Sequence, residues 1–133
     1  AVWIGQWGLS SFPGPTGYPL AVIAFGAFLG HCFPVYLAFK GGKGVATALG
    51  IFLIISPLVV LLAIPIFVVT TYLGKFVSLG SMVSAVSFPV LLGCLHYPSE
   101  TVVLSLFIAL GIILKHHENI KRILGGEEKS WRN

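Results

Sequence analysis

The chain has 133 residues, of which 56% are apolar and 9% charged, and its formal net charge is +4. This balance excludes an ordinary soluble domain, in which about a quarter of the residues are charged, and a mean hydropathy of +0.97 agrees with that exclusion. Apolar stretches long enough to cross about 30 Å of hydrocarbon recur along the chain, so the fold class is all-α, a polytopic helical membrane protein. The positive charge then reflects lysines and arginines of cytoplasmic loops, and a nucleic-acid partner is not expected.

The first elements are an interfacial segment and a membrane helix. Residues 1–16 carry no charge but are rich in Trp, Gly, Ser and Pro, which favours a position among the lipid headgroups. A first spanning helix is expected from Gly17 to about Leu37. Gly26 and Gly30 form a face of small residues on it, which would allow a neighbouring helix to approach closely.

The apolar sequence over residues 45–73 predicts two helices instead of one. A single helix of this length would measure about 43 Å, too long for one crossing without strong tilt. A break at Ser56-Pro57 removes this difficulty, because proline cannot continue the hydrogen bonds of the preceding turn. We therefore expect a short helix that ends near Ile55, packed as a partial span, and a second helix over about 57–73.

A fourth helix over about 78–95 and a fifth over about 101–114 follow, joined by an outer turn, and a basic C-terminal segment ends the chain. Counting crossings puts every basic residue on one side, which should be cytoplasmic: Lys40, Lys43, Lys75, Lys115, Lys121, Arg122, Lys129 and Arg132. The expectation is one transmembrane helical domain over residues 1–133, with about five membrane helices or half-helices and a C-terminal interfacial helix. Since the chain begins at Ala1 without Met or a signal region, we expect an N-terminally truncated fragment.

A glycine- and lysine-rich segment precedes the short helix and has the features of a phosphate site. Its sequence is Phe39-Lys40-Gly41-Gly42-Lys43-Gly44-Val45-Ala46-Thr47. Glycines let backbone N–H groups approach an oxyanion, and the helix N-terminus and the lysines add positive charge. It is not the nucleotide P-loop, which needs Ser or Thr directly after its lysine. The alternative is a tight turn whose lysines only mark the membrane boundary.

The C-terminal segment offers a second group of polar residues. On a helix, His116, Asn119 and Arg122 (or Ile123) would share one face. Histidine can accept a proton near neutral pH, and asparagine can orient a hydroxyl or donate to an oxyanion. The same segment could instead be a juxtamembrane amphipathic helix. His31, within the first spanning helix, is either a functional group or a packing histidine.

Several kinds of site are excluded. The chain has no Asp, and its four Glu lie outside the apolar stretches, so neither a His-x4-Asp pair nor an intramembrane carboxylate relay or di-metal site can form. Cys32 and Cys94 fall near opposite membrane faces, so we expect no disulfide, and they have no metal-ligand spacing.

Four strings together resemble the bacterial acyl-phosphate:glycerol-3-phosphate acyltransferase family. They are Gly30-His31-Cys32-Phe33-Pro34-Val35, the glycine- and lysine-rich segment, Val77-Ser78-Leu79-Gly80-Ser81, and His116-x-x-Asn119-x-x-Arg122-x-x-x-Gly126-x-Glu128. They follow in order along essentially the whole chain. The family's first motif, a loop with an essential Ser and Arg, would precede Ala1 and is absent from this sequence.

The resemblance implies a multi-pass enzyme of phospholipid biosynthesis in the bacterial inner membrane, with its active face cytoplasmic. It would transfer a fatty acyl group from acyl phosphate to the 1-hydroxyl of glycerol 3-phosphate, without a metal or other cofactor. The resemblance implies catalytic roles for His116 and Asn119. Substrate binding would fall to Lys40, Gly41, Gly42, Lys43, Gly44, Thr47 and Arg122, and structural support to Gly30, His31, Ser78, Ser81, Gly126 and Glu128.

Acyl phosphate has a good leaving group, so the hypothesis is direct attack by the hydroxyl, with Lys43 and glycine N–H groups on the phosphate. The acyl tail would lie between helices, near Gly26 and Gly30. The competing class is a transporter or exporter component that uses its basic face for anions. A transporter should show polar residues along a path across the bilayer, whereas here they gather on one face.

Overall fold

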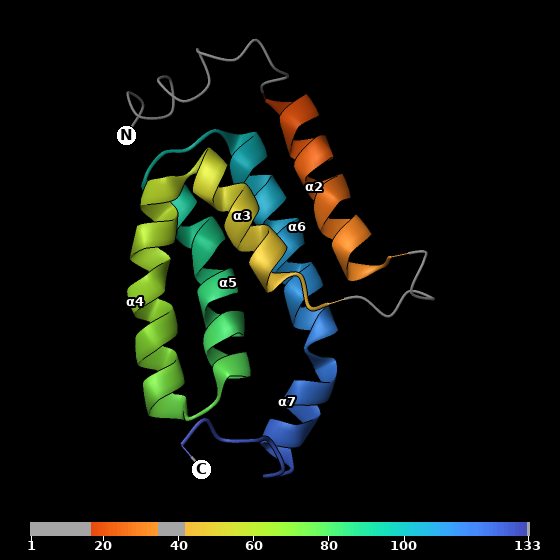
Figure 1. Ribbon diagram of the computed structural model, residues 1–133. Coiled ribbons are helices and arrows are strands. Elements are labelled where there is room, and N and C mark those ends of the chain that lie inside the picture. Colours follow the sequence, from red (N-terminus) through yellow and green to blue (C-terminus); the bar gives the residue numbers. More distant parts are fainter. Residues whose placement is uncertain (1–16, 35–41, 133) are drawn as a thin grey trace.

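The computed structural model describes residues 17–34 and 42–132, in which every regular element is a helix (Figure 1). The helices are α2 (Tyr18–Cys32), α3 (Val45–Ile55), α4 (Pro57–Gly74), α5 (Val77–Cys94), α6 (Ser99–Lys115) and α7 (His117–Leu124). Within these residues, α4 and α5 are each long and apolar enough to cross a membrane, and α6 with α7 forms a third candidate span bent by 55°. The expected all-α membrane fold is confirmed. The predicted interfacial segment 1–16 lies outside the described residues.

The expected break between α3 and α4 occurs at the predicted position. Ser56 has φ −150° and ψ 66°, and α4 begins at Pro57. Ser56 is fully buried, and its N–H still donates to the carbonyl of Phe52 at 2.8 Å. The eleven residues of α3 span only about 16 Å, roughly half of the hydrocarbon thickness. It is therefore a half-helix packed against its neighbours.

The first helix is shorter than predicted. The sequence pattern extends it to about Leu37, but α2 ends at Cys32, and Phe33 leaves helical geometry with φ −132° and ψ 58°. The physical reason is Pro34, because the residue before a proline is disfavoured in the helical region. The carbonyl of Cys32, in the last turn of α2, accepts a hydrogen bond from Lys115 Nζ at 2.9 Å. This contact joins the end of α2 to the end of α6.

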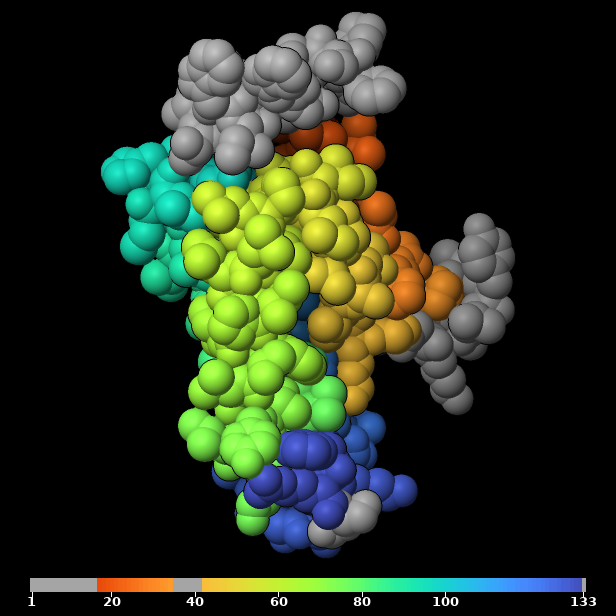
Figure 2. Space-filling view, turned by 60° about the vertical axis from the view of Figure 1, so that its left-hand side comes forward, coloured from red at the N-terminus to blue at the C-terminus, as the bar shows by residue number. Residues whose placement is uncertain are grey.

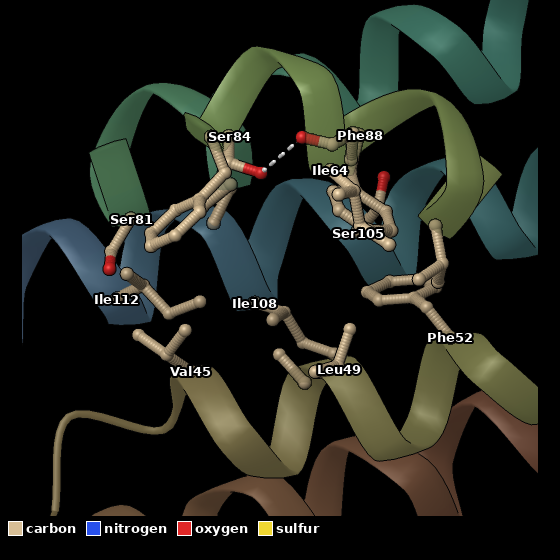
Figure 3. Close-up of a pocket in the computed structure, with 16 residues that line it drawn as sticks. Val45, Leu49, Phe52, Ile64, Ser81, Ser84, Phe88, Ser105, Ile108 and Ile112 are labelled. Carbon is tan, nitrogen blue, oxygen red and sulfur yellow. Dashed lines mark hydrogen bonds between the residues drawn. The ribbon is translucent and has the colours of Figure 1, made fainter. Parts of the chain in front are cut away.

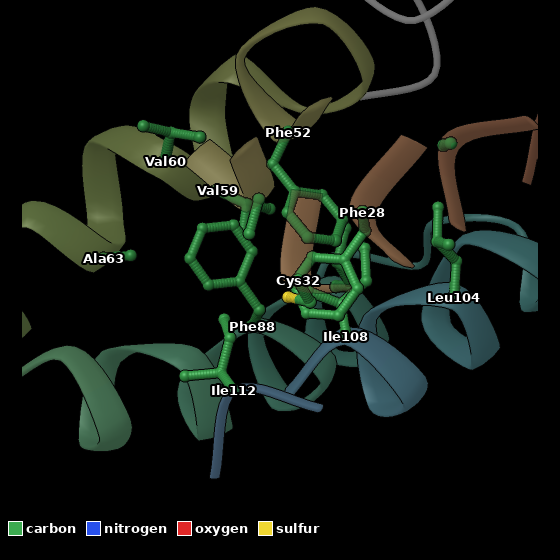
Figure 4. Packing of buried hydrophobic residues seen from close by; sticks show 13 residues of the cluster. Phe28, Cys32, Phe52, Val59, Val60, Ala63, Phe88, Leu104, Ile108 and Ile112 are labelled. Carbon is green, nitrogen blue, oxygen red and sulfur yellow. The ribbon is translucent and has the colours of Figure 1, made fainter. Parts of the chain in front are cut away.

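The helices pack with α5 between α4 and α6, and α2 packs on α6 (Figure 1). Three buried phenylalanines, Phe28, Phe52 and Phe88, form the centre of the core (Figure 4). The close approach predicted at Gly26 and Gly30 is not found among the described residues, where nothing lies within 4 Å of a Cβ built on either glycine. Their face of α2 points away from the other described helices.

Close helix approach occurs at Gly80 of α5 instead, and this gives a testable prediction. A Cβ on Gly80 would overlap the Thr71 hydroxyl and lie 3.0 Å from the Phe67 carbonyl oxygen, both on α4. Backbone cannot yield as a side chain can, so Gly80→Ala should destabilise the protein by about 1–3 kcal/mol. The measurement is the thermal midpoint in detergent. Gly93→Ala, on the same helix with open space around it, is the control and should not lower the midpoint.

The basic residues of the described chain gather at one end of the bundle. The N-terminal ends of α3 and α5 and the C-terminal ends of α4 and α6 lie toward α7 (Figure 1). The α5–α6 turn lies at the other end and carries no lysine or arginine. This arrangement agrees with the topology derived from the sequence.

Candidate functional site

The two cationic segments found in the sequence meet in space. Lys43 Nζ donates a hydrogen bond to Asn119 Oδ1 at 2.5 Å, although the two residues are 76 positions apart. Lys43 directly precedes the N-cap of α3, and Asn119 lies in the first turn of α7. This contact places the glycine-rich turn and the C-terminal helix around one site.

Glycine is needed in the turn because the turn packs tightly onto the end of α2. Gly44 is the N-cap of α3 and has φ 78°, a left-handed conformation that glycine adopts without strain. A Cβ there would overlap the ring of Phe28 and lie 2.7 Å from Cys32 Sγ. A Cβ on Gly42 would lie 2.7 Å from His31 Nε2. His31 therefore packs against this turn at the mouth of the site.

His116 stands at the bend between α6 and α7 and is 2% exposed. Its Nδ1 lies 2.8 Å from the Ile112 carbonyl oxygen. Since a carbonyl only accepts, Nδ1 carries the proton, and Nε2 of the neutral ring has a free lone pair. Burial lowers the pKa of His116 below its ordinary value, and the charge of Lys43 acts in the same direction. The site thus holds a neutral histidine whose Nε2 can accept a hydrogen bond.

Glu128 connects three segments around this histidine. Its Oε1 accepts hydrogen bonds from Ser78 Oγ at 2.8 Å and from Asn119 Nδ2 at 2.5 Å, and its Oε2 accepts from Arg122 Nε at 2.7 Å. The bonds from Arg122, Asn119 and Ser78 lower its pKa from 4.5 to about 2, against the opposing effect of burial. Because the amide nitrogen of Asn119 donates to Glu128, the Oδ1 of Asn119 must be the atom that accepts the hydrogen bond from Lys43. The carboxylate therefore fixes the orientation of Asn119.

The turn after α7 brings Glu128 back to that helix. Gly126 has φ 72°, and Glu127 N–H then donates to the Arg122 carbonyl at 2.7 Å. Further on, Trp131 donates from its backbone to the Lys75 carbonyl at 3.2 Å and from its indole to the Thr71 carbonyl at 3.0 Å. Figure 2 shows this C-terminal tail, in dark blue, against the lower end of α4. These contacts hold the residues that follow Glu128 against the C-terminal end of α4.

These residues surround a cavity of about 430 Å³. It is lined by His31, Lys43, Gly44, Val45, Ala46, Val77, Ser78, Ser81, His116, Asn119, Glu128 and Lys129. Two lysines, Lys43 and Lys129, line it, and its one carboxylate already accepts three hydrogen bonds. Lys43 has two further N–H donors. Such a cavity suits a small, negatively charged molecule.

Some of the other residues selected from the sequence do not line this cavity. Gly30, Gly42, Thr47, Arg122 and Gly126 do not line the cavity, and Lys40 and Gly41 lie outside the described residues. Arg122, expected to bind substrate, instead directs its guanidinium to Glu128 and, at 4.0 Å, to Glu118. Lys129 does line the cavity, yet its sequence position marked it only as a boundary lysine. Its adjacency to Glu128 was the one signal that could have identified it.

A second, apolar groove of about 200 Å³ adjoins the cavity between α3, α4, α5 and α6 (Figure 3). Val45 and Ser81 line both spaces, so the groove and the cavity are neighbours. The other lining residues are Ala48, Leu49, Phe52, Val60, Ala63, Ile64, Phe67, Ser84, Ala85, Phe88, Ser105, Ile108, Ala109 and Ile112. Neither Gly26 nor Gly30 lines this groove, although the sequence had suggested a groove beside them.

The stability of the folded protein should depend on pH at acidic values, because Glu128 becomes protonated there. A carboxylate whose pKa is depressed to about 2 stabilises the folded state above its ordinary pKa of 4.5, and this contribution is lost as the pH falls from 4.5 toward 2. We expect the thermal midpoint in detergent to fall across this window, and Glu128→Gln to remove most of that dependence. Glu127→Gln, at the exposed neighbour, is the control. An unchanged acid profile in Glu128→Gln would contradict the hydrogen bonds described here.

Comparison with known proteins gives one family. The family model for glycerol-3-phosphate acyltransferase matches residues 1–126. The glycerol-3-phosphate acyltransferase of Syntrophotalea carbinolica is 47% identical over 113 residues, covering 85% of this chain and 58% of that relative. The one of Laribacter hongkongensis is 38% identical over 128 residues, covering 96% of this chain and 63% of that relative. The chain thus spans somewhat over half the length of these curated relatives.

Solved structures agree in fold. The crystal structure of PlsY (YgiH), an integral membrane glycerol 3-phosphate acyltransferase, matches in its glycerol 3-phosphate form with a TM-score of 0.85 and 34% identity. That match covers 96% of this chain and 63% of that one. The lysophosphatidic acid form matches with a TM-score of 0.84. On the extent of the family match and the identity to these relatives, the chain belongs to the glycerol-3-phosphate acyltransferase family.

Proposed function

We propose that the protein transfers a fatty acyl group from acyl phosphate to the 1-hydroxyl of glycerol 3-phosphate, giving lysophosphatidate and phosphate. The observation that carries this proposal is that Lys43, His116 and Asn119 line one cationic cavity and that an apolar groove adjoins it. One space suits the phosphate and glycerol, and the other suits a hydrocarbon chain. The names of the curated relatives and the two ligand forms of the solved neighbour support the acceptor and the product.

The phosphate of the acceptor would sit at the N-terminus of α3. Lys43 and Lys129 supply positive charge there, and backbone N–H groups of the glycine turn and the first turn of α3 supply donors. His31, against the turn, lies beside the same place. The glycerol hydroxyls would then extend toward His116 and Asn119.

His116 and Asn119 would position the attacking hydroxyl. The free lone pair on His116 Nε2 can accept the hydrogen bond of the 1-hydroxyl, whose oxygen attacks the acyl carbon. The bond from that carbon to the phosphate oxygen breaks, phosphate leaves, and the hydroxyl proton passes to a phosphate oxygen or to Nε2. Because the leaving group is good, orientation and charge neutralisation are the main contributions the site must make.

We also propose that this site faces the cytoplasm from a bacterial inner membrane. The basic residues of the described helices gather at the end that carries the cavity, as the positive-inside rule expects for a cytoplasmic face. The acyl chain of the donor already lies in the lipid. It could enter the groove from the bilayer beside Leu49 and Ile64, which both line the groove and are exposed.

The test is an assay on membranes that carry the protein. Labelled glycerol 3-phosphate with acyl phosphate should yield labelled lysophosphatidate, and acyl-CoA in place of acyl phosphate should yield none. Product from acyl-CoA alone would overturn the choice of donor. Uptake of label without any lysolipid would favour the transporter alternative and overturn the enzyme.

The pH dependence of this reaction should follow His116. Burial lowers its pKa below the ordinary 6.5, so the acceptor form of Nε2 persists until the pH falls below that value. We expect kcat/KM to be flat at neutral pH and to fall with a midpoint below 6.5. Glu128, with a pKa of about 2, cannot produce such a limb. A midpoint above 6.5 in the initial-rate profile would contradict the neutral histidine.

A further inference from the structure

We propose that Phe52 and Phe88 form the closed end of the apolar groove and set the length of the acyl chain that the protein transfers. This inference rests on the proposed function, and it adds which residues select the donor. Figure 3 shows Val45, Ser81 and Ile112 at one end of the groove and Phe52 and Phe88 at the other. The first end adjoins the polar cavity, where the acyl carbon would react.

The two phenylalanines make a solid wall. Their ring centroids are 4.7 Å apart with an interplanar angle of 38°, and their residues are 2% and 9% exposed. Val59 and Leu92, both fully buried, belong to the same packed cluster. Figure 4 shows Val59 beside the two rings. A chain that reaches the rings can therefore go no further along the groove.

Before that end, several of the side chains that line the groove are small. Small side chains from four helices line the middle of the groove beside Leu49, Ile64 and Ile108: Ala48, Ala63, Ser84, Ala85 and Ala109. The two aromatic rings at the far end define where the available space ends (Figure 3). From Val45 to Phe52 the axis of α3 rises about 10 Å, which sets the depth of the groove.

Selection would come from fit, because both the groove and the surrounding lipid are apolar. In a membrane there is no hydrophobic driving force between two apolar environments, so packing decides. A chain that ends at the rings fills the groove. The end of a longer chain must turn out between α3 and α4, past the exposed Leu49 and Ile64. A shorter chain leaves part of the groove empty and loses packing contacts.

The experiment offers membranes an equimolar mixture of acyl phosphates of increasing chain length and measures the lysophosphatidate products by mass spectrometry. The ratio of products does not depend on the amount of folded enzyme, so the chain-length preference of a less stable variant can still be measured. Phe52→Leu and Phe88→Ala lengthen the groove and should shift the distribution toward longer chains. Ser84→Leu fills it from the side and should shift the distribution toward shorter chains. The expected change in the ratio of neighbouring lengths is about tenfold.

Phe28→Leu is the matched control. Phe28 is 1% exposed and belongs to the same core, but it does not line the groove. It should lower the yield without changing the chain-length distribution. If the distributions of Phe52→Leu, Phe88→Ala and Ser84→Leu all equal that of Phe28→Leu while wild-type protein transfers acyl groups, this inference is overturned. If wild-type protein uses no acyl phosphate of any length, the proposed function itself fails.

Discussion

Replacing His116 with alanine should reduce kcat for acyl transfer at least about tenfold, equivalent to about 1.4 kcal/mol of transition-state stabilisation. His116 is buried beside Lys43 and Asn119, and its Nδ1 is committed to the Ile112 carbonyl. Its Nε2 is therefore the group that can hold the attacking hydroxyl. Alanine removes that acceptor and leaves the cavity otherwise intact. The measurement is the initial rate of lysophosphatidate formation in membranes.

His117→Ala is the control for this prediction. His117 is exposed, and its Nδ1 contacts the Leu114 carbonyl at 2.9 Å in the same way, but it does not line the cavity. The two variants remove the same ring and the same kind of backbone contact. Wild-type rates for His116→Ala, or an equal loss for His117→Ala, would show that the buried imidazole has no special part in the reaction.

Replacing Lys43 with alanine should also cost at least about tenfold in turnover, with a higher KM for glycerol 3-phosphate. The ammonium group is the charge nearest the N-terminus of α3 that lines the cavity, and it also holds Asn119 Oδ1. Its removal weakens phosphate binding and frees the amide that lies beside the reacting hydroxyl. The measurement is kcat and KM at fixed acyl phosphate.

Lys121→Ala serves as the matched control because Lys121 is exposed on α7 and lies outside the cavity lining. It removes the same charge from the same face of the membrane, so any loss caused by surface charge alone appears in both variants. Rates unchanged from wild type in Lys43→Ala would overturn its assignment to the site. Similar losses in the two lysine variants would assign the effect to the charge of the membrane surface.

Most helix ends could be predicted because they follow local rules. The break at Ser56-Pro57 needs only the lost hydrogen bond of a proline, and α3 to α6 begin and end within about two residues of the expected positions. The end of α2 was misplaced because apolar sequence continues beyond it, and apolar composition was given more weight than Pro34. Both signals are local, and they disagreed there.

The site could be predicted from the sequence only in part. The glycine turn and the pair His116 and Asn119 could be selected from residue type and spacing. The pairing of Arg122 with Glu128, the entry of Lys129 into the cavity and the apolar groove could not, because they depend on where a tail folds back and how four helices pack. The small-residue face of α2 led to the wrong position for the groove for the same reason.

By itself, the order of residues determined the membrane class, the positions of most helices and the chemical character of two cationic segments, since these depend on hydropathy, charge and backbone geometry within a few residues. Only the tertiary structure decided that Lys43 reaches Asn119 across 76 positions, that Glu128 orients this amide, and that a groove lined by Phe52 and Phe88 adjoins the cavity. The physical reason is that contacts between distant segments arise from packing of whole helices, and side-chain volumes summed over several helices define an empty space.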